Sequence, residues 1–317
     1  MKILVTGGAG FIGSHLIKKL LEENFSAVCV DNFNNYYNPE IKEENVSRFI
    51  NNSNFKLYRE DIRNFEALDK IFEKERFDKV VHLAAMAGVR NSIRYPVLYS
   101  EVNIQGTINL LELSGKYKIK NFIFASSSSV YGGNTKIPFS ESDQVNHPIS
   151  PYAATKKAGE LICHTYHHLY HLNIICLRFF TVYGPSGRPD MAPYKFTGKI
   201  LAGEEISMFG DGSSQRNYTY IDDITEGIYS ALNKDFGYEI INLGGSQLIS
   251  LKNFISLIES ISGRKAKIKQ VGEQSGDMPI TSADISKAKR LLDYCPKTDI
   301  KKGMNIFIDW FKKKYYE

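Results

Sequence analysis

The chain has 317 residues, of which 43% are hydrophobic and 24% are charged, and its formal net charge is +5. These proportions are typical of a folded protein and exclude an intrinsically disordered chain. The positive charge is small and evenly spread, so it suits an anionic ligand and does not indicate a nucleic-acid-binding protein. No apolar run approaches the roughly 18 residues that cross a bilayer, and no signal-peptide pattern opens the chain. We therefore expect no membrane partner and a cytoplasmic location.

Short runs rich in Val, Ile and Phe alternate along the chain with segments of helical length. The predicted strands are Lys2–Thr6, Ala27–Asp31, Phe55–Arg59, Lys79–Leu83, Asn121–Ala125, Asn173–Phe179 and Glu239–Leu243. The predicted helices are Phe11–Glu23, Phe65–Glu75, Pro96–Lys116, Pro151–Tyr170, Met191–Ala202, Asp222–Asn233, Leu251–Ser262 and Lys301–Lys314. This alternation favours an α/β fold, in which helices cover both faces of a parallel sheet.

Polarity rises after about Tyr183, where the loops contain Gly-Pro, Arg-Pro-Asp and Gly-Asp-Gly. We expect residues 1–180 to form a first domain and residues 181–317 to form mainly a smaller, interleaved α/β C-terminal region that binds the substrate. Residues 217–246 are expected to return to the first domain.

A glycine-rich turn follows the first predicted strand and opens the first helix. Gly7, Gly10 and Gly13 have the spacing G-x-x-G-x-x-G, which in this context is typical of a dinucleotide site. Glycines let the backbone approach a pyrophosphate, which binds the N–H groups at the helix start. Asp31 ends the second strand, where its carboxylate can accept hydrogen bonds from an adenosine ribose and would repel a 2′-phosphate. The sequence therefore predicts NAD as the cofactor, bound to a Rossmann-type doubly wound sheet.

Other cofactor contacts are expected beside the turn and where later strands end. They are Phe11, Ile12, Asn32, Asp61, Ile62, Leu83, Ala84 and Ala85.

A second motif, Y-x-x-x-K, opens the predicted helix at Pro151. Tyr152 and Lys156 are four residues apart and share one helix face. A free phenol has a pKa of about 10, and a nearby ammonium charge lowers it toward that of a useful base. Upstream, Ser126-Ser127-Ser128-Ser129 ends a strand, where an open parallel sheet presents side chains to a ligand. A serine there can donate a hydrogen bond to a reacting hydroxyl.

In this order and spacing, the glycine turn, the Ser-Ser-Ser-Ser-Val-Tyr-Gly run and Y-x-x-x-K resemble the extended short-chain dehydrogenase/reductase superfamily across essentially the whole chain. Further segments resemble its UDP-glucuronate 4-epimerases, namely Gly88–Arg90, Arg178–Pro185, Gly187–Ala192 and Tyr218–Asp223. The resemblance implies that Tyr152 is the general base, Lys156 its electrostatic partner and ribose ligand, and Ser127 the catalytic hydroxyl. It also implies an NAD-dependent 4-epimerase that interconverts UDP-glucuronate and UDP-galacturonate through a 4-keto intermediate.

The substrate must keep its carboxylate, because a 4-keto uronate loses carbon dioxide readily unless hydroxyls and a cation hold that group. Related dehydratases and decarboxylases carry acids just before the Val-Tyr-Gly, where this chain has serines. The expected substrate-binding residues are Ser127, Ser128, Ser129, Thr181, Arg188, Lys195, Arg216, Asp277 and Arg90. By resemblance, Arg216 is expected at the diphosphate and Asp277 at the nucleotide ribose.

Two other functions stay open at this point. A UDP-glucose or UDP-N-acetylhexosamine 4-epimerase shares most of these motifs, although a neutral sugar needs no cation such as Arg188. A non-catalytic NAD-binding regulator typically lacks the catalytic Tyr or Lys, and this chain has both. The resemblance also implies a homodimer that pairs through the helices Pro96–Lys116 and Pro151–Tyr170.

One helix combines a cysteine and four histidines at spacings that zinc ligands also use. They are Cys163, His164, His167, His168 and His171. No carboxylate or glycine pattern supports a metalloenzyme, so we predict no metal site. The four cysteines form no C-x-x-C pair, and free thiols of this kind are typical of a reducing compartment.

Overall fold

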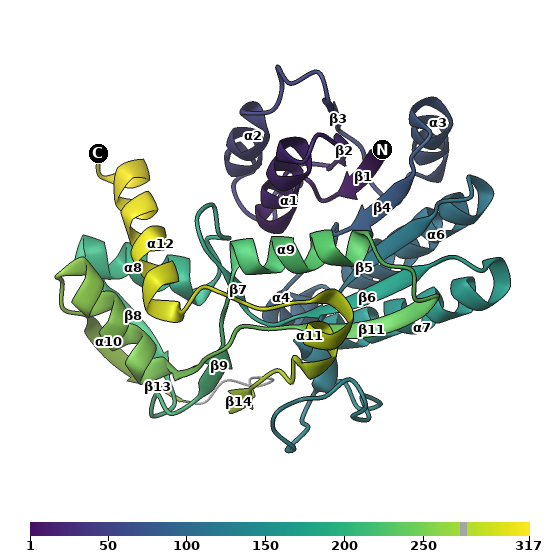
Figure 1. Ribbon diagram of the computed structural model, residues 1–317. Helices are drawn as coiled ribbons and strands as arrows, with labels where there is room; N and C mark the ends of the chain where they lie inside the picture. Colours follow the sequence, from purple (N-terminus) through teal and green to yellow (C-terminus); the bar gives the residue numbers. More distant parts are fainter. Residues whose placement is uncertain (273–277) are drawn as a thin grey trace.

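The computed structural model describes residues 1–272 and 278–317. Seven parallel strands form its main sheet, in the spatial order β11-β6-β5-β4-β1-β2-β3 (Figure 1). The strands are β1 (Lys2–Thr6), β2 (Ser26–Val30), β3 (Phe55–Tyr58), β4 (Lys79–His82), β5 (Asn121–Ser127), β6 (Ile174–Phe179) and β11 (Tyr238–Leu243). The strand order reverses between β1 and β4, which is the place where doubly wound sheets bind ligands. The predicted α/β, Rossmann-type fold is confirmed.

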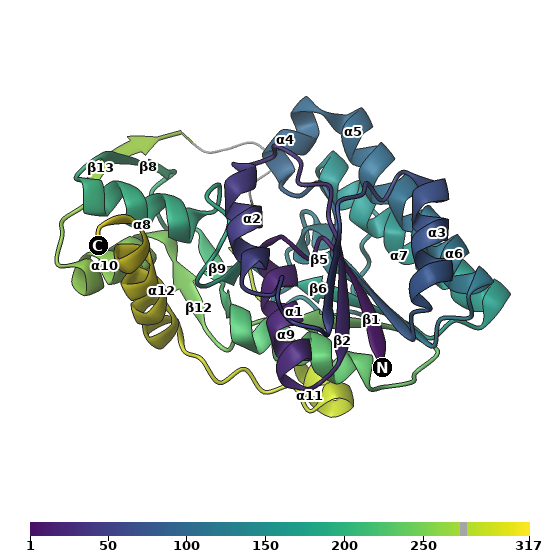
Figure 2. The same ribbon diagram turned by 90° about the horizontal axis from the view of Figure 1, so that it is seen from above.

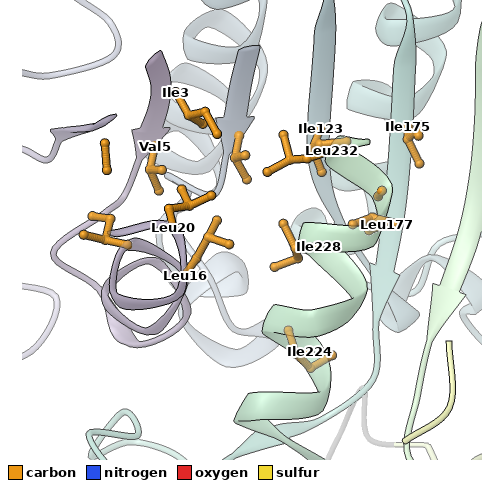
Figure 3. Packing of buried hydrophobic residues seen from close by; sticks show 14 of the residues in the cluster. Ile3, Val5, Leu16, Leu20, Ile123, Ile175, Leu177, Ile224, Ile228 and Leu232 are labelled. Atoms are coloured by element: carbon orange, nitrogen blue, oxygen red, sulfur yellow. The ribbon is translucent and has the colours of Figure 1, made fainter. Parts of the chain in front are cut away.

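Helices cover both faces of this sheet (Figure 2). One face packs against α1 (Phe11–Glu22), α2 (Pro39–Ser47), α9 (Ile221–Leu232) and α11 (Ser286–Leu292). The other packs against α3 (Phe65–Glu75), α6 (Gly106–Lys116) and α7 (Pro151–Tyr170). Figure 3 shows the first of these cores, where Leu16 and Leu20 of α1 and Ile228 of α9 lie against the strands. Because both faces are buried, the strands read as continuous apolar runs and do not alternate with polar residues.

The long helix α7 has clear local reasons to begin and end where it does. The Ser150 hydroxyl accepts a hydrogen bond of 3.1 Å from the backbone N–H of Ala153, and Pro151 occupies the first turn. The helix ends at His171, whose backbone is left-handed with φ of 53°. The Ser150 cap fixes where α7 begins, and it thereby fixes the positions of Tyr152 and Lys156.

A second layer of structure lies beside the carboxyl edge of the sheet, on the left in Figure 1. Its helices are α8 (Ala192–Ala202), α10 (Leu251–Ser262) and α12 (Ile300–Tyr315). Its strands form three small sheets: β7 (Val182–Tyr183) with β10 (Thr219–Tyr220), β8 (Glu205–Phe209) with β13 (Lys267–Val271), and β9 (Gln215–Asn217) with β12 (Leu248–Ser250) and β14 (Ile280–Thr281). These elements share a separate apolar core that includes Ile206, Phe254 and Phe307.

The segment Pro96–Lys116, predicted as one helix, is divided in the structure. It consists of α5 (Pro96–Ser100), a π-helical turn at Glu101–Gln105, and α6. Within the wide turn, the Asn103 side chain accepts from the backbone N–H of Met86 at 2.8 Å and donates to the Met86 carbonyl at 2.9 Å. The short helices α2, α4 (Val89–Arg94) and α11 were not predicted. No helix in the part of the chain that the structure describes is both long and apolar enough to cross a membrane.

Candidate active site

The glycine turn is closed so tightly that it has no room for side chains. Gly7 has φ of +68°, and a Cβ atom there would lie 2.7 Å from the backbone nitrogen of Ala84. A Cβ on Gly13 would lie 2.3 Å from the carbonyl oxygen of Gly7. No side chain caps the start of α1 at Gly10, so the first N–H groups of the helix face the space beside the turn. This is the arrangement that binds a pyrophosphate.

A cavity of about 360 Å³ extends from this turn along the carboxyl ends of the strands. Most of the predicted site residues line it. They are Gly7, Gly10, Phe11, Ile12, Gly13, Asp31, Asn32, Ile62, Leu83, Ala84, Ala85, Ser127, Ser128, Ser129, Tyr152, Lys156, Thr181 and Arg188. One open space therefore reaches from the glycine turn to the predicted catalytic and substrate residues.

The carboxylate of Asp31 is buried at one end of this cavity. It accepts hydrogen bonds from the backbone N–H groups of Ala9 at 3.2 Å and Phe33 at 2.9 Å. It also pairs with the buried ammonium of Lys42 at 3.2 Å. Lys42 belongs to α2 and was missed in the sequence, where the polar α2 segment lacks helical periodicity. The glycine turn, the free helix N–H groups and this buried acid together fit an NAD molecule.

Tyr152 lines the cavity beside Ser127. Burial raises the pKa of the Tyr152 phenol, whereas a hydrogen bond with Ser127 and the charge of Arg188 lower it. The Ser127 hydroxyl in turn donates to the Ser129 hydroxyl at 3.1 Å and accepts from the Ser129 backbone N–H at 3.2 Å. The Tyr99 ring meets Tyr152 edge to face, with centroids 6.3 Å apart. These contacts orient the phenol toward the serine turn.

Lys156 lies one turn after Tyr152, and its ammonium is buried. Its Nζ atom donates to the Ala125 carbonyl at 2.7 Å and lies 5.1 Å from the centroid of the Phe124 ring. Burial lowers the Lys156 pKa to about 8, while the charge of Glu160 acts in the opposite direction.

Arg188 is held in place by Asp190, which belongs to the Gly187–Ala192 motif but was not predicted to have a role. Its Nε and Nη2 atoms donate to Asp190 at 2.9 and 2.6 Å. The guanidinium carbon lies 5.4 Å from the centroid of the Tyr36 ring, and the Tyr36 hydroxyl donates to the Ala87 carbonyl at 2.7 Å. The only sequence signal for Tyr36 is its place in the Tyr36-Tyr37 pair, in the polar loop after Asp31, and Tyr36 was not predicted as a site residue.

Several predicted residues do not line the cavity. The Asp61 carboxylate accepts from the Asn32 amide at 2.8 Å and pairs with Arg63 at 2.9 Å. Lys195 is exposed on α8. Arg216 donates to the Gln215 carbonyl at 2.9 Å.

The other two predicted substrate residues are Arg90 and Asp277. The Arg90 guanidinium carbon lies 5.1 Å from the centroid of the Phe209 ring, so it connects α4 with β8. Asp277 lies outside the residues that the structure describes.

The histidine-rich part of α7 is distributed around the helix. Cys163 is buried, whereas His164, His168 and His171 are exposed. His167 forms a hydrogen bond of 2.8 Å between Nδ1 and the Leu172 carbonyl. Among the described residues there is no group of three or more His, Cys, Asp or Glu side chains arranged to hold a metal ion.

Known proteins resemble this chain over nearly its full length. A UDP-glucuronate 4-epimerase of Thermodesulfobacterium geofontis is 46% identical over 98% of this chain and 96% of its own length. The crystal structure of UDP-glucuronic acid 4-epimerase from Bacillus cereus, in complex with UDP-glucuronic acid and NAD, is 41% identical with a TM-score of 0.94, and covers 99% of this chain and 100% of that one.

A UDP-glucose 4-epimerase from Thermotoga maritima, solved with UDP-glucose, is also similar, at 34% identity and a TM-score of 0.92 over 99% of both chains. The model of the NAD dependent epimerase/dehydratase family matches residues 3–244. Since both the family model and these relatives span most of the sequence, the chain belongs to the NAD-dependent epimerase/dehydratase family.

Proposed function

We propose that the protein interconverts UDP-glucuronate and UDP-galacturonate by inverting C4 of the sugar. The observation that carries this proposal is the convergence of Tyr152, Ser127 and Arg188 in one cavity that continues to the glycine turn. The similarity to UDP-glucuronate 4-epimerases at 41 to 46% identity supports it. When bound, NAD supplies the acceptor and donor of the hydride.

Tyr152 takes the proton from the sugar O4 in this proposal, and Ser127 holds the same hydroxyl. The phenol must be ionised to act as a base, and burial opposes this. The Ser127 hydroxyl and the Arg188 cation both favour the ionised form. Loss of the O4 proton and of a hydride from C4 gives a 4-keto sugar. This sugar rotates in the cavity, and its C4 is then reduced on the opposite face. Tyr152 then returns the proton.

The uronate carboxylate is the group that Arg188, Ser128, Ser129 and Thr181 are proposed to bind. All four residues line the same cavity as Tyr152. Because Nε and Nη2 of Arg188 are engaged by Asp190, its remaining edge is the one that faces an incoming anion. A carboxylate held by a cation and hydroxyls resists decarboxylation, since its charge is stabilised in place.

A second candidate function is a UDP-glucose 4-epimerase, favoured by the similarity to the Thermotoga maritima enzyme. The two functions differ at C6, where the uronate has a charge and the hexose has a hydroxyl. Arg188 favours the uronate, because a neutral hydroxymethyl group cannot form an ion pair with a cation in the cavity.

The nucleotide is proposed to bind the second layer, in residues 181–317, with Lys195, Arg216 and Asp277 as candidate contacts and Arg90 of α4 as a further one. Residues 217–246 are proposed to belong with the NAD-binding domain, because β11 is a strand of the main sheet. The free cysteines support a cytoplasmic, reducing location.

The protein is further proposed to form a homodimer through α5 and α7. Exposed apolar side chains on and beside these helices support this pairing: Tyr95, Val97, Leu161, Leu169 and Tyr170. Sedimentation of the purified protein at several concentrations tests it, and a monomer at every concentration contradicts it.

Incubation with UDP-glucuronate and separation of the products tests the reaction. We expect UDP-galacturonate from the unmodified protein, and at least a 100-fold lower rate from Tyr152→Phe, because phenylalanine fills the same space without the proton-transferring oxygen. Both proteins should bind the same amount of NAD. A UDP-pentose product would indicate decarboxylation, and turnover of UDP-glucose alone would favour the second candidate.

A further inference from the structure

A row of polar residues crosses the main sheet beneath the proposed active site. On the α7 side of β5, β6 and β11, the side chains are apolar until Ser126, Arg178 and Asn242. Ser126 and Asn242 are the register partners of Arg178 on its two neighbouring strands. All three are buried, and Arg178 is only 1% exposed. Charge at this depth needs an explanation, because apolar residues pack there at lower cost.

Glu160 of α7 joins this row to the helix that carries Tyr152 and Lys156. Its fully buried carboxylate accepts from Arg178 Nε and Nη2, both at 2.8 Å. It also accepts from the Ser126 hydroxyl at 2.6 Å and from the ammonium of Lys157, on its own helix, at 3.3 Å. A bidentate pair with a third donor fixes both the distance and the rotation of the helix relative to the two strands.

The contacts continue from Arg178 to the loops that contain Phe139 and Asp284. The guanidinium carbon lies 4.8 Å from the centroid of the Tyr131 ring, and the Tyr131 hydroxyl donates to the Asn242 amide oxygen at 2.7 Å. The Asn242 amide nitrogen donates to the carbonyls of Phe139 and Asp284 at 3.0 and 3.2 Å. Glu160, Arg178, Ser126, Tyr131 and Asn242 are called the Glu160 network below.

The buried Glu160–Arg178 pair is not explained by a contribution to the stability of the fold. The Arg178 Nη1 atom is buried without a hydrogen-bond partner in the described structure. A buried ion pair with an unsatisfied donor generally gives no more stability than apolar residues of the same size. What this pair does provide is geometry: Ser126 immediately precedes Ser127, and Glu160 lies two turns beyond Tyr152 on the same helix.

We infer that Glu160 and Arg178 are positioning residues for the reaction, which hold α7 against β5 so that the Tyr152 phenol meets the Ser127 hydroxyl. They touch neither cofactor nor substrate and act through the helix and the strand end. The inference deepens the proposed function and rests on the roles proposed there for Tyr152 and Ser127.

The double variant Glu160→Met/Arg178→Met tests it, because it removes both fully buried charges together and leaves only Lys157, whose side chain is 19% exposed, without its Glu160 contact. We expect a folded protein with a Tm equal to or above that of the unmodified protein, and unchanged NAD affinity. We expect kcat to fall at least 10-fold while KM changes less than 3-fold, since the substrate contacts stay and the base and hydroxyl separate. A purely structural role would lower Tm and leave kcat per folded molecule unchanged.

Glu75→Met is the matched control. Glu75 has an equally buried carboxylate, bonded to Lys2, Lys56 and Tyr58, but it lies near the amino end of β1. Its loss should lower Tm without changing kcat. If the double variant does not fold, Arg178→Lys tests the inference instead. Lysine keeps the positive charge but cannot form the two parallel hydrogen bonds to Glu160. We expect it to lower kcat 3- to 10-fold.

A crystal structure of the variant gives a readout that is independent of the substrate. We expect the Tyr152 phenol to be displaced from Ser127. Wild-type kcat in a folded variant, or an unchanged position of Tyr152, would overturn the inference. Absence of any UDP-glucuronate turnover by the unmodified protein would instead refute the proposed function, and the structure of the variant would still decide the role of Glu160 and Arg178.

Discussion

Arg188 is prepared for an anion before one arrives. Asp190 holds one edge of the guanidinium through two hydrogen bonds, and the Tyr36 ring lies against its face. A long side chain that is already fixed loses little conformational entropy when it binds. The Arg188 charge therefore contributes to carboxylate affinity with little offset from ordering.

Arg188→Ala should consequently affect the two candidate substrates differently. We expect kcat/KM for UDP-glucuronate to fall about 10- to 100-fold, the equivalent of roughly 1.5–3 kcal/mol for a hydrogen bond to a charged group. We expect UDP-glucose turnover to fall less, because it loses only the help that the Arg188 charge gives to ionisation of Tyr152 and loses no carboxylate contact. Steady-state kinetics with both substrates on one enzyme preparation measures this. An equal loss for both would favour the neutral-sugar function.

At the residue scale, the residues inside the motifs could be predicted from the sequence, whereas the contacts between distant segments could not. The G-x-x-G-x-x-G turn, Asp31, Tyr152 and Lys156 all line one cavity. The bond from Lys156 to the Ala125 carbonyl was not predictable, because every residue has a carbonyl and no pattern marks the one that accepts. Asp190 likewise became visible only once its distance to Arg188 was known.

Among the elements, α7 approaches β5 unusually closely. A Cβ atom on Gly159 would lie 2.4 Å from Cζ of the Phe124 ring. A glycine inside a helix costs about 1 kcal/mol relative to alanine, so its presence here reflects the need for close contact. This contact lets α7 lie deep enough on the sheet for Glu160 to reach Arg178 and Ser126.

Gly159→Ala should push α7 away from the sheet. We expect an overpacking cost of about 1–3 kcal/mol in the free energy of unfolding, together with a fall in kcat as Tyr152 moves with the helix. Urea denaturation and steady-state kinetics measure the two effects.

Gly115→Ala in α6 is the matched control for this prediction, because its Cβ would lie 3.5 Å from the Tyr170 ring, an ordinary contact. We expect it to be neutral or stabilising, since alanine favours the helix. Similar behaviour of the two variants would contradict the packing argument.

Element prediction succeeded where hydrophobic periodicity is strong. All seven strands of the main sheet were predicted to within about two residues, because buried strands form distinct apolar runs. The strands β7, β10 and β14 contain only two residues each, too few to show a pattern. The π-helical turn depends on Asn103 reaching Met86, a contact between distant segments that no local signal reveals.

For the whole molecule, the buried His82 and the half-buried His15 should make stability depend on pH. Burial lowers the pKa of His82 to about 3 and that of His15 to about 4, from 6.5. Below pH 6.5 the unfolded chain takes up protons at both sites, whereas the folded protein does so only near pH 4 and below. The free energy of unfolding should therefore fall as pH falls from 6.5 to about 4, by up to about 1.4 kcal/mol per pH unit for each histidine.

His82→Gln should weaken this dependence. Glutamine keeps a polar side chain between the hydroxyls of Thr6 and Thr107, which His82 contacts at 2.8 and 2.9 Å, but does not titrate. Urea denaturation at pH 7, 6 and 5 measures the slope, which we expect to be smaller in the variant. Identical slopes would show that another group binds the protons.

The edge strand β11 has a consequence for how the chain is made. β6 pairs with β11 along its whole length, from Ile174 to Phe179, yet β11 comes after α8 and α9 in the sequence. While the ribosome synthesises the intervening residues, the nascent chain presents the unpaired backbone of an apolar strand, Ile174-Ile175-Cys176-Leu177. Translation that stalls before residue 238 would leave this edge open to other chains, and such fragments would be natural clients of chaperones.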